Sequence, residues 1–243
     1  MFERSLAFFR PHHQELRYRL IKIFICIAVC SGVAYIFSET LTERFIAPLF
    51  AASPLVSTLV YTNLPEAFFS YLKLSLLVGI AASYPFTLFQ LWMFIAPGLE
   101  KTEKRFGLLV VFWATLLFCC GGAFAFFIVL PKMLIYFLSY GGPNLEPLPK
   151  FGKYLTFVAR TILTFGLAFE IPFLMVMAGK ANFIQANRFR EKRLYFYIAI
   201  VTLAFLLTAG DLMGCLLLAI PLFGLYEAGI LLTRLFANNK TTP

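Results

Sequence analysis

The sequence predicts an all-α polytopic membrane protein that crosses a bilayer six times. Of its 243 residues, 60% are hydrophobic and only 14% are charged, whereas soluble proteins contain roughly 45–50% apolar and about 25% charged residues. The 30 phenylalanines point the same way, because a soluble helix buries one apolar stripe while a membrane helix accepts apolar side chains on every face. This composition excludes a water-soluble core.

Six apolar stretches define one predicted transmembrane domain, residues 1–243. They lie at about residues 20–38, 67–94, 107–137, 155–179, 194–209 and 214–232. A bilayer needs about 20 helical residues, and the last two stretches correspond to only about 16 and about 18 residues, or roughly 24–27 Å of helix. We therefore expect the bilayer to become thinner beside two short final helices.

Prolines mark three places along the predicted spans. The second and third stretches are longer than a bilayer requires, and they contain Pro85 and Pro131. Because proline removes a backbone hydrogen bond and bends a helix, a kink, a tilt or a protrusion beyond the bilayer should absorb the excess. Pro11 is predicted to be the first helical residue of the segment that enters the membrane.

Basic residues predict the orientation of the chain, because the cytoplasmic connections of membrane proteins carry an excess of Lys and Arg. Fifteen basic residues lie in the two terminal segments and in the connections 95–106 and 180–193, whereas Arg44, Lys150 and Lys153 occupy the alternate connections. Both termini should therefore face the cytoplasm. The net charge of +9 is spread over short clusters between apolar stretches, so no nucleic-acid partner is expected.

Residues for metal binding or catalysis are scarce. The five cysteines form no C-x-x-C pair and are expected to be reduced packing residues in the apolar stretches. His12 and His13 are the only histidines, and Asp211 is the single aspartate. Intramembrane proteases need a Ser-His pair, a metal site or two aspartates. We therefore expect no enzyme, no catalytic residues, no metal and no cofactor.

Short segments distributed along the whole chain carry a more specific signal. They are His13-x-Glu15-Leu16-Arg17-x-Arg19-Leu20, Phe94-Ile95-Ala96-Pro97-Gly98-Leu99, Glu103-Lys104-Arg105, Phe165-Gly166-x-x-Phe169-Glu170-x-Pro172, Arg190-Glu191-Lys192-Arg193, Thr208 with Asp211, and Leu218-Ala219-Ile220-Pro221 with Glu227. As a set, in this order and spacing, they resemble the TatC family, the signal-peptide receptors of the twin-arginine protein translocase.

The resemblance implies a six-span, glove-shaped receptor in the bacterial inner membrane, with both termini in the cytoplasm. It implies binding of the twin-arginine signal peptides of folded cargo and export driven by the proton-motive force. TatA-like and TatB-like single-span proteins are the implied partners, with self-association in a receptor complex. One departure concerns the last periplasmic turn, where Ala209 and Gly210 replace the two prolines common in the family, so this turn is expected to be looser.

The resemblance also assigns candidate sites. The signal-peptide site comprises Glu15, Arg17, Phe94, Lys101 and Glu103. A docking site for a partner helix inside the membrane comprises Glu170 with Phe165 and Phe169. The periplasmic cap contains Pro48, and the last periplasmic turn contains Thr208 and Asp211.

Independent physical reasons support the signal-peptide site. An arginine presents a planar, permanently charged fork, and a carboxylate can accept two parallel hydrogen bonds from it. Glu15 and Glu103, on separate segments, could therefore read two arginines. The alternative for Glu15 is a helix-stabilising ion pair with Arg19, four residues later. Glu100 lies outside the family pattern and is expected to be a solvated loop residue.

Glu170 lies inside an apolar stretch, where a charged carboxylate costs several kcal/mol and therefore suggests a functional site. Gly166, one turn earlier, is expected to leave a notch through which another helix could approach closely. The alternative is a structural glutamate that is hydrogen-bonded to a neighbouring threonine. A second function class, a proton-coupled secondary transporter with Glu170 as the proton carrier, is disfavoured because the sequence shows no inverted internal repeat.

Overall fold

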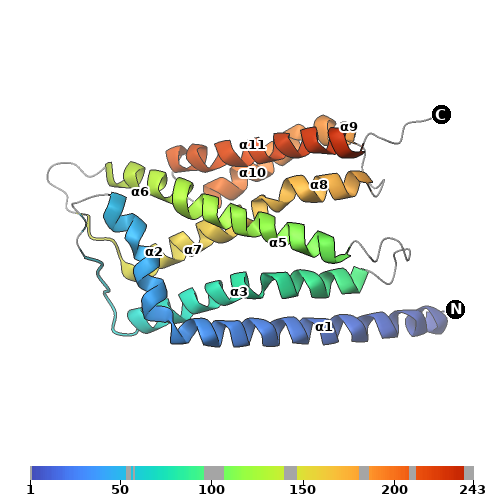
Figure 1. Ribbon diagram of the computed structural model, residues 1–243, viewed down its shortest axis with the longest axis horizontal. Helices are drawn as coiled ribbons and strands as arrows, with labels where there is room; N and C mark the ends of the chain where they lie inside the picture. Colours follow the sequence, from blue (N-terminus) through green and yellow to red (C-terminus); the bar gives the residue numbers. More distant parts are fainter. Residues whose placement is uncertain are drawn as a thin grey trace. The chain divides into compact units, whose positions relative to one another are not determined.

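The computed structural model describes residues 2–52, 56, 58–95, 107–139, 147–180, 186–207 and 212–237. Within these ranges the chain is helical apart from turns, short irregular stretches and one isolated parallel bridge between Val60 and Lys150. In chain order the helices are α1 (Phe2–Ile36), α2 (Ser38–Ala52), α3 (Glu66–Ile95), α5 (Gly107–Phe124), the π-helix η2 (Ala125–Val129), α6 (Leu130–Ser139), α7 (Phe151–Ala168), α8 (Glu170–Lys180), α9 (Ala186–Glu191), α10 (Arg193–Leu207) and α11 (Leu212–Ala237) (Figure 1). The predicted all-α class is confirmed.

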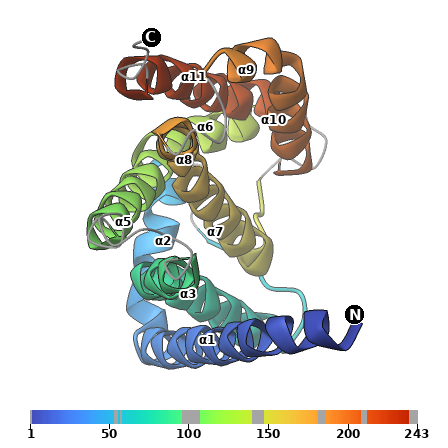
Figure 2. The same cartoon turned by 90° about the vertical axis from the view of Figure 1, so that its right-hand side faces the viewer.

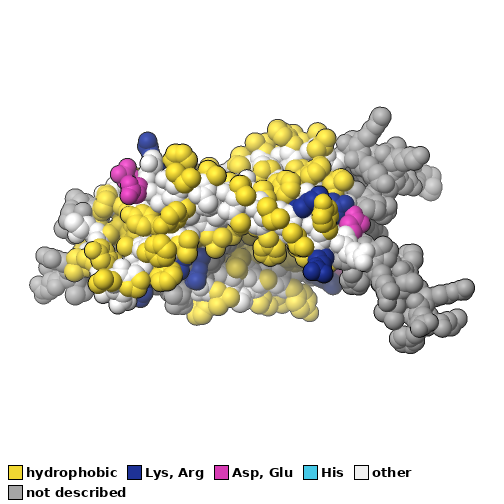
Figure 3. All heavy atoms as spheres, turned by 90° about the horizontal axis from the view of Figure 1, so that it is seen from below, with side chains coloured by type: hydrophobic (Ala, Val, Ile, Leu, Met, Phe, Trp, Pro, Cys, Tyr) yellow, Lys and Arg dark blue, Asp and Glu magenta, His cyan; other side chains and the backbone are white. Residues whose placement is uncertain are grey.

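Five helical segments of the described chain are long and apolar enough to cross a membrane. They are Gln14–Ile36, Glu66–Phe94, Gly107–Ser139, Phe151–Gly179 and Leu218–Leu235, and the apolar helix segment Arg193–Leu206 is shorter. Hydrophobic side chains cover most of the described surface in the view of Figure 3, which a bilayer can solvate and water cannot. The chain is a multi-pass membrane protein.

The last two spans differ in length. Helix α10 contains 15 residues, or about 22 Å at 1.5 Å per residue, and is shorter than the hydrocarbon layer. Helix α11 contains 26 residues, but its apolar stretch Leu218–Leu235 contains 18. Helix α10 is therefore short over its whole length, whereas in α11 only the apolar stretch is short. The expectation of a thinner bilayer depends on these two segments.

The chain divides into two compact units, of which the first comprises Met1–Arg44 with Asn63–Leu116 and the second Phe45–Thr62 with Leu117–Pro243. In the first unit α1 and α3 lie side by side (Figures 1 and 2). Helix α1 begins at Phe2, so the prediction that Pro11 starts the helix is wrong. A proline removes one hydrogen bond from a helix, but its fixed φ is compatible with the helical backbone.

Small residues allow the close approach of α1 and α3. Ser75, Gly79 and Ser83 recur every four residues on α3, and both serines are 1% exposed. The Ser75 and Ser83 hydroxyls donate to the carbonyls of Tyr71 and Ile80 of their own helix, at 2.8 and 3.1 Å. Because the Ser75 and Ser83 hydroxyls are satisfied within α3, they add no unpaired donor to the interface with α1. The buried Ser31 hydroxyl of α1, in contrast, has no hydrogen-bond partner among the described residues.

Pro131 is accommodated by a widened helical turn. It is the second residue of α6, directly after the π-helix η2. The Leu130 N–H donates to the Ala125 carbonyl, five residues earlier. A π-turn provides room for the proline ring, which would otherwise clash with the carbonyl four residues before it. The α-helical hydrogen-bond pattern of the long third span therefore changes to a π-turn just before the proline, and the helical segment continues to Ser139.

The fourth span is interrupted at Glu170. Helix α7 ends at Ala168, and α8 starts with Glu170. The Phe169 N–H still bonds to the Phe165 carbonyl at 3.0 Å, but Pro172 has no N–H to continue the ladder two residues into α8. The intramembrane glutamate therefore sits in the first turn of a new helix.

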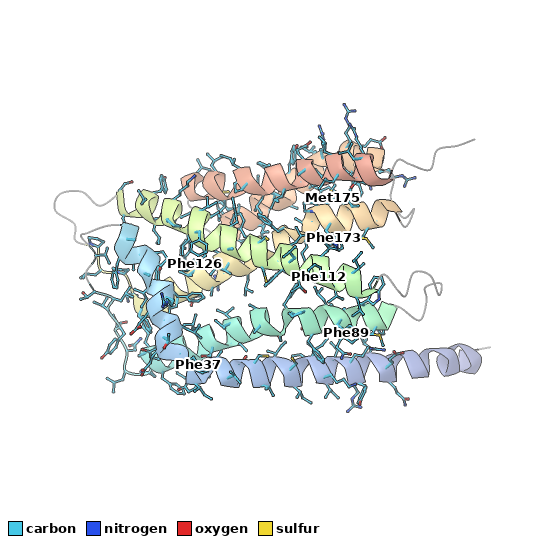
Figure 4. The ribbon with its side chains drawn as sticks, viewed as in Figure 1. Phe37, Phe89, Phe112, Phe126, Phe173 and Met175 are labelled. Carbon is cyan, nitrogen blue, oxygen red and sulfur yellow. The ribbon has the colours of Figure 1, made fainter. Side chains whose placement is uncertain are left out.

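The core of the second unit lies where α8, α10 and α11 pack against η2 and α7. Met175 of α8 lies on the side facing α11 (Figure 4), and a Cβ on Gly229 would lie 2.6 Å from its sulfur and 3.1 Å from Pro172 Cα. Gly229 therefore permits a close contact between α8 and α11. The completely buried Tyr226 and Phe165 belong to the same core.

Pro48 lies within α2, whose C-terminal part belongs to the second unit. The Tyr154 hydroxyl of α7 donates to the Phe45 carbonyl of α2 at 2.8 Å and also forms a hydrogen bond with the Leu49 backbone. The tyrosine hydroxyl thus links α7 to α2 one residue after the proline.

Candidate functional site

Glu15 forms an ion pair with Arg19 one turn later on α1. Arg19 Nε and Nη2 both donate to Glu15 Oε1, at 3.1 and 2.5 Å. Arg19 Nη1 donates to Gln90 Oε1 of α3 at 3.4 Å. The Arg19 side chain is 16% exposed and the Glu15 side chain 36% exposed. The ion pair that the sequence left as an alternative for Glu15 is therefore present, and α3 takes part in it.

This arrangement leaves part of the Glu15 carboxylate available. Arg19 Nε and Nη2 both bond to Oε1, and within the described part of the chain Oε2 accepts no hydrogen bond. The carboxylate is held in place from two helices and is still one-third exposed. A carboxylate with one oxygen fixed and one accessible can accept a second guanidinium group.

Phe94, another predicted site residue, lies one helical turn after Gln90 near the end of α3 and is half-buried. Trp92 lies against Gly107, the first residue of α5, where a Cβ would lie 2.6 Å from the ring atom Cε2. The ends of α3 and α5 therefore meet at this contact. Lys101 and Glu103, which lie between these two helices in the sequence, are outside the described residues.

Arg17 is exposed. It is two residues from both Glu15 and Arg19, so it lies on a different face of α1 from the ion pair. The structure thus brings Glu15 together with the end of α3 but places Arg17 beside this site rather than within it.

The second predicted site surrounds the helix break at Glu170, whose side chain is buried with 6% exposure. Phe165 is completely buried and Phe169 is half-buried. The ring of Phe124 lies 5.9 Å from the Phe165 ring and 5.4 Å from the Phe169 ring, between centroids. The three predicted residues are therefore close together, with Phe165 inside the core and Phe169 nearer the surface.

The notch expected at Gly166 is filled by the chain itself. A Cβ on Gly166 would lie 2.7 Å from Phe118 Cε2, and a Cβ on Gly121 would lie 2.9 Å from Phe169 Cβ. Gly166 therefore allows a residue of α5 to pack against α7. An incoming helix cannot use this notch unless Phe118 moves.

The remaining predicted site residues are separate from these two places. Pro48 lies in α2, while Thr208, Asp211 and the preceding Ala209 and Gly210 lie outside the described residues. The cysteines Cys26, Cys30, Cys119, Cys120 and Cys215 form no disulfide. Among the described residues no group of three His, Cys, Asp or Glu side chains could hold a metal ion.

One polar cluster was given no role in the sequence prediction. Arg193 Nη2 of α10 donates to Glu227 Oε2 of α11 at 2.7 Å, and the Tyr197 hydroxyl donates to Glu227 Oε1 at 2.5 Å. Both side chains of the ion pair are partly exposed, at 38% and 40%. An acidic residue inside an apolar stretch is the signal that drew attention to Glu170, and the same signal identifies Glu227.

Comparison with known proteins agrees with this architecture. Residues 11–221 match the family described as "Sec-independent protein translocase protein (TatC)". The relative with this name from Desulforapulum autotrophicum is 37% identical over 232 residues, which cover 96% of this chain and 86% of the relative. Those from Haemophilus influenzae and Escherichia coli are 35% and 32% identical and each cover 93% of this chain and 88% of the relative.

A solved structure supports the same assignment at the level of the fold. The crystal structure of the "Twin Arginine Translocase Receptor- TatC" is 35% identical in sequence and superposes with a TM-score of 0.84. The match covers 92% of this chain and 98% of the other. Since the family match spans most of the sequence and the fold agrees over nearly the same length, this chain belongs to the TatC family of Sec-independent protein translocase proteins.

Proposed function

We propose that this chain is the receptor subunit of a twin-arginine translocase and binds the paired arginines of signal peptides on folded cargo. The observation that carries the proposal is the carboxylate of Glu15. Arg19, which also donates to Gln90 of α3, holds this carboxylate by one oxygen and leaves the other available. The family assignment and the likeness to a twin-arginine translocase receptor support the same function.

The chemistry of recognition follows from the geometry of the guanidinium group. Glu15 Oε2 accepts a hydrogen bond from one signal arginine while Arg19 retains Oε1. Glu103 accepts the second arginine from the connection between α3 and α5, and Phe94 provides an aromatic surface beside it. Lys101 and Arg17 add positive charge around the site, which disfavours binding of unrelated cations. Specificity then depends on how well the two carboxylates match the two guanidinium groups.

We place the receptor site on the cytoplasmic side of a bacterial inner membrane, with both termini on that side. The distribution of Lys and Arg between the two sets of connections supports this orientation. Pro48, Thr208 and Asp211 then belong to the periplasmic side. The chain acts by binding, assembly and conformational change, with energy from the proton-motive force, and not as an enzyme.

Glu170 is proposed as the docking point for TatA-like and TatB-like single-span partners. Its position at a helix break in a membrane span supports this role, because the break frees backbone groups and concentrates polarity in an apolar setting. Since Glu170 is 6% exposed and Phe165 completely buried, a partner meets the Phe169 side of this place first. Phe165 then acts by positioning Glu170, and docking includes a local rearrangement of side chains.

Site-specific photo-crosslinking tests the receptor assignment. A photoreactive amino acid in place of Phe94 should crosslink to a twin-arginine signal peptide in membrane vesicles, and a peptide with glutamines in place of both arginines should not. The same probe at exposed Phe68 near the start of α3 is the matched control and should give no crosslink. Equal crosslinking of both peptides at position 94 would contradict the proposal.

A further inference from the structure

A short basic helix is attached to the end of the α10–α11 pair. Helix α9 contains Phe189, which is 6% exposed, between the exposed residues Arg188 and Arg190. The Tyr226 hydroxyl of α11 donates to the Phe189 carbonyl at 2.8 Å. Tyr226 is completely buried, so this hydrogen bond fixes the backbone of α9 to the core. Arg188 and Arg190 therefore flank an anchored phenylalanine in the sequence of α9. Figure 2 shows α9 beside α10 and α11.

Aromatic rings pack closely in the core beneath α9. The Phe196 ring stacks on the Tyr226 ring at 4.8 Å between centroids, and Tyr197 lies edge-on to Phe223 at 4.9 Å. Glu227 joins α10 and α11 through Arg193 and Tyr197. A helix of six residues has little stability of its own, so these contacts determine where its charges lie.

Three of the four basic residues between positions 188 and 193 have no carboxylate partner among the described residues. Arg188, Arg190 and Lys192 are exposed, and among the described residues the ion pairs are Arg19 with Glu15 and Arg193 with Glu227. Glu191 is exposed in the same segment, so the local excess is two positive charges. These groups are available to an anionic ligand.

The first residues of α10 indicate that these cations lie at the membrane boundary. Leu194 and Tyr195, at the start of α10, are 68% and 73% exposed. Exposed apolar and aromatic side chains directly beside Lys and Arg are typical of the boundary between hydrocarbon and headgroups. Helix α10 is only about 22 Å long, so a bilayer that matches it brings its headgroups towards α9.

We propose that α9 and Lys192 form a binding surface for the phosphate headgroups of anionic phospholipids, fixed in position by Tyr226. A lipid fits better than an acidic protein, because Leu194 and Tyr195 offer acyl chains an apolar surface next to the cations. This inference requires only that the chain spans a membrane. It is independent of signal-peptide recognition and of the direction in which the chain is inserted.

Lipid crosslinking in nanodiscs tests the surface directly. Phosphatidylglycerol with a photoreactive headgroup, present in both leaflets, should crosslink mainly to residues 186–195 of the wild type, and a phosphatidylcholine probe should not. Each cation near an anionic surface changes affinity about fivefold. The triple variant Arg188→Gln, Arg190→Gln, Lys192→Gln should therefore lose at least about tenfold in crosslinking at these residues. A variant that loses three other exposed cations, at Arg44, Lys132 and Lys153, should keep it.

Tyr226→Phe separates a positioned surface from charge alone. The variant keeps every cation but loses the hydroxyl that holds α9, and its preference for phosphatidylglycerol over phosphatidylcholine at residues 186–195 should fall several-fold. Inorganic phosphate should not compete, because it lacks acyl chains. Unchanged crosslinking in the triple variant, an unchanged lipid preference in Tyr226→Phe, or full competition by phosphate would each overturn the proposal.

Discussion

Gly79 of α3 lies directly against Ser31 of α1, where a Cβ on Gly79 would approach Ser31 Cα to 2.7 Å. No ordinary side chain can be accommodated there without moving one helix. The distance between the two helices also determines whether Arg19 of α1 can reach Gln90 of α3. The close contact in the middle of the first unit therefore supports the polar site near its end.

Substitution of Gly79 by alanine should lower the thermal stability of the protein in detergent. Alanine favours a helix over glycine by about 1 kcal/mol, but overpacking at this contact costs about 1–3 kcal/mol. The matched control is Gly32→Ala on α1, where a Cβ would meet nothing within 4 Å, and its melting temperature should stay equal or rise. A Gly79→Ala protein as stable as Gly32→Ala would show that the helices are not in close contact.

Much of this fold could be predicted from sequence because its signals are local. Apolar stretches locate the spans, and the prolines at positions 131 and 172 lie next to the interruptions at η2 and Glu170. The contacts between distant segments could not be predicted. Phe118 fills the space at Gly166, and Arg193 reaches Glu227 across 34 residues of sequence. No periodic pattern in the sequence indicates either contact, because each depends on which faces two packed helices turn towards each other.

The candidate sites divide in the same way. Glu15 and Glu170 could be chosen because a carboxylate near or within an apolar stretch is unusual. That Arg19 bonds to both Glu15 and Gln90, and that Phe165 is inside the core, depends on packing. The start of α1 at Phe2 rather than Pro11 could not be predicted for a different reason. A proline inside a helix removes one backbone hydrogen bond, and the rest of the helix can still form around it.

Glu170 substitutions should separate hydrogen bonding from charge. Glu170→Gln keeps a hydrogen-bonding side chain and should retain part of the export activity and of the copurification with single-span partners. Glu170→Leu should lose both while the protein remains at its normal level in the membrane. Full export by the leucine variant would exclude a docking role for this carboxylate.

Arg193 and Glu227 should stabilise the α10–α11 pair only modestly. Both side chains are more than one-third exposed, so a double-mutant cycle with Arg193→Gln and Glu227→Gln should give a coupling free energy of about 0.5–1 kcal/mol. The measurement is thermal or denaturant unfolding in detergent. A coupling energy near zero would indicate that aromatic packing alone joins these helices.

Lengthening α10 should affect transport before binding. Four leucines inserted into α10 add about 6 Å of helix and should restore the normal bilayer thickness beside it. Export should decrease while the affinity for signal peptide is retained, because Glu15 and Phe94 of the proposed peptide site belong to the first unit and α10 to the second. Parallel loss of binding and export, with reduced protein level, would instead indicate misfolding.

The affinity of the purified protein for a twin-arginine peptide, compared with its twin-lysine version, tests the receptor function most directly. Glu15→Ala should weaken twin-arginine binding by about 0.5–3 kcal/mol, depending on how far the pair is desolvated. Twin-lysine binding should change less, because lysine lacks the planar fork. Glu103→Ala should act in the same direction, and Glu39→Ala, an exposed acid at the start of α2, should have no effect. Unchanged twin-arginine affinity in stably folded Glu15→Ala and Glu103→Ala proteins would contradict the account.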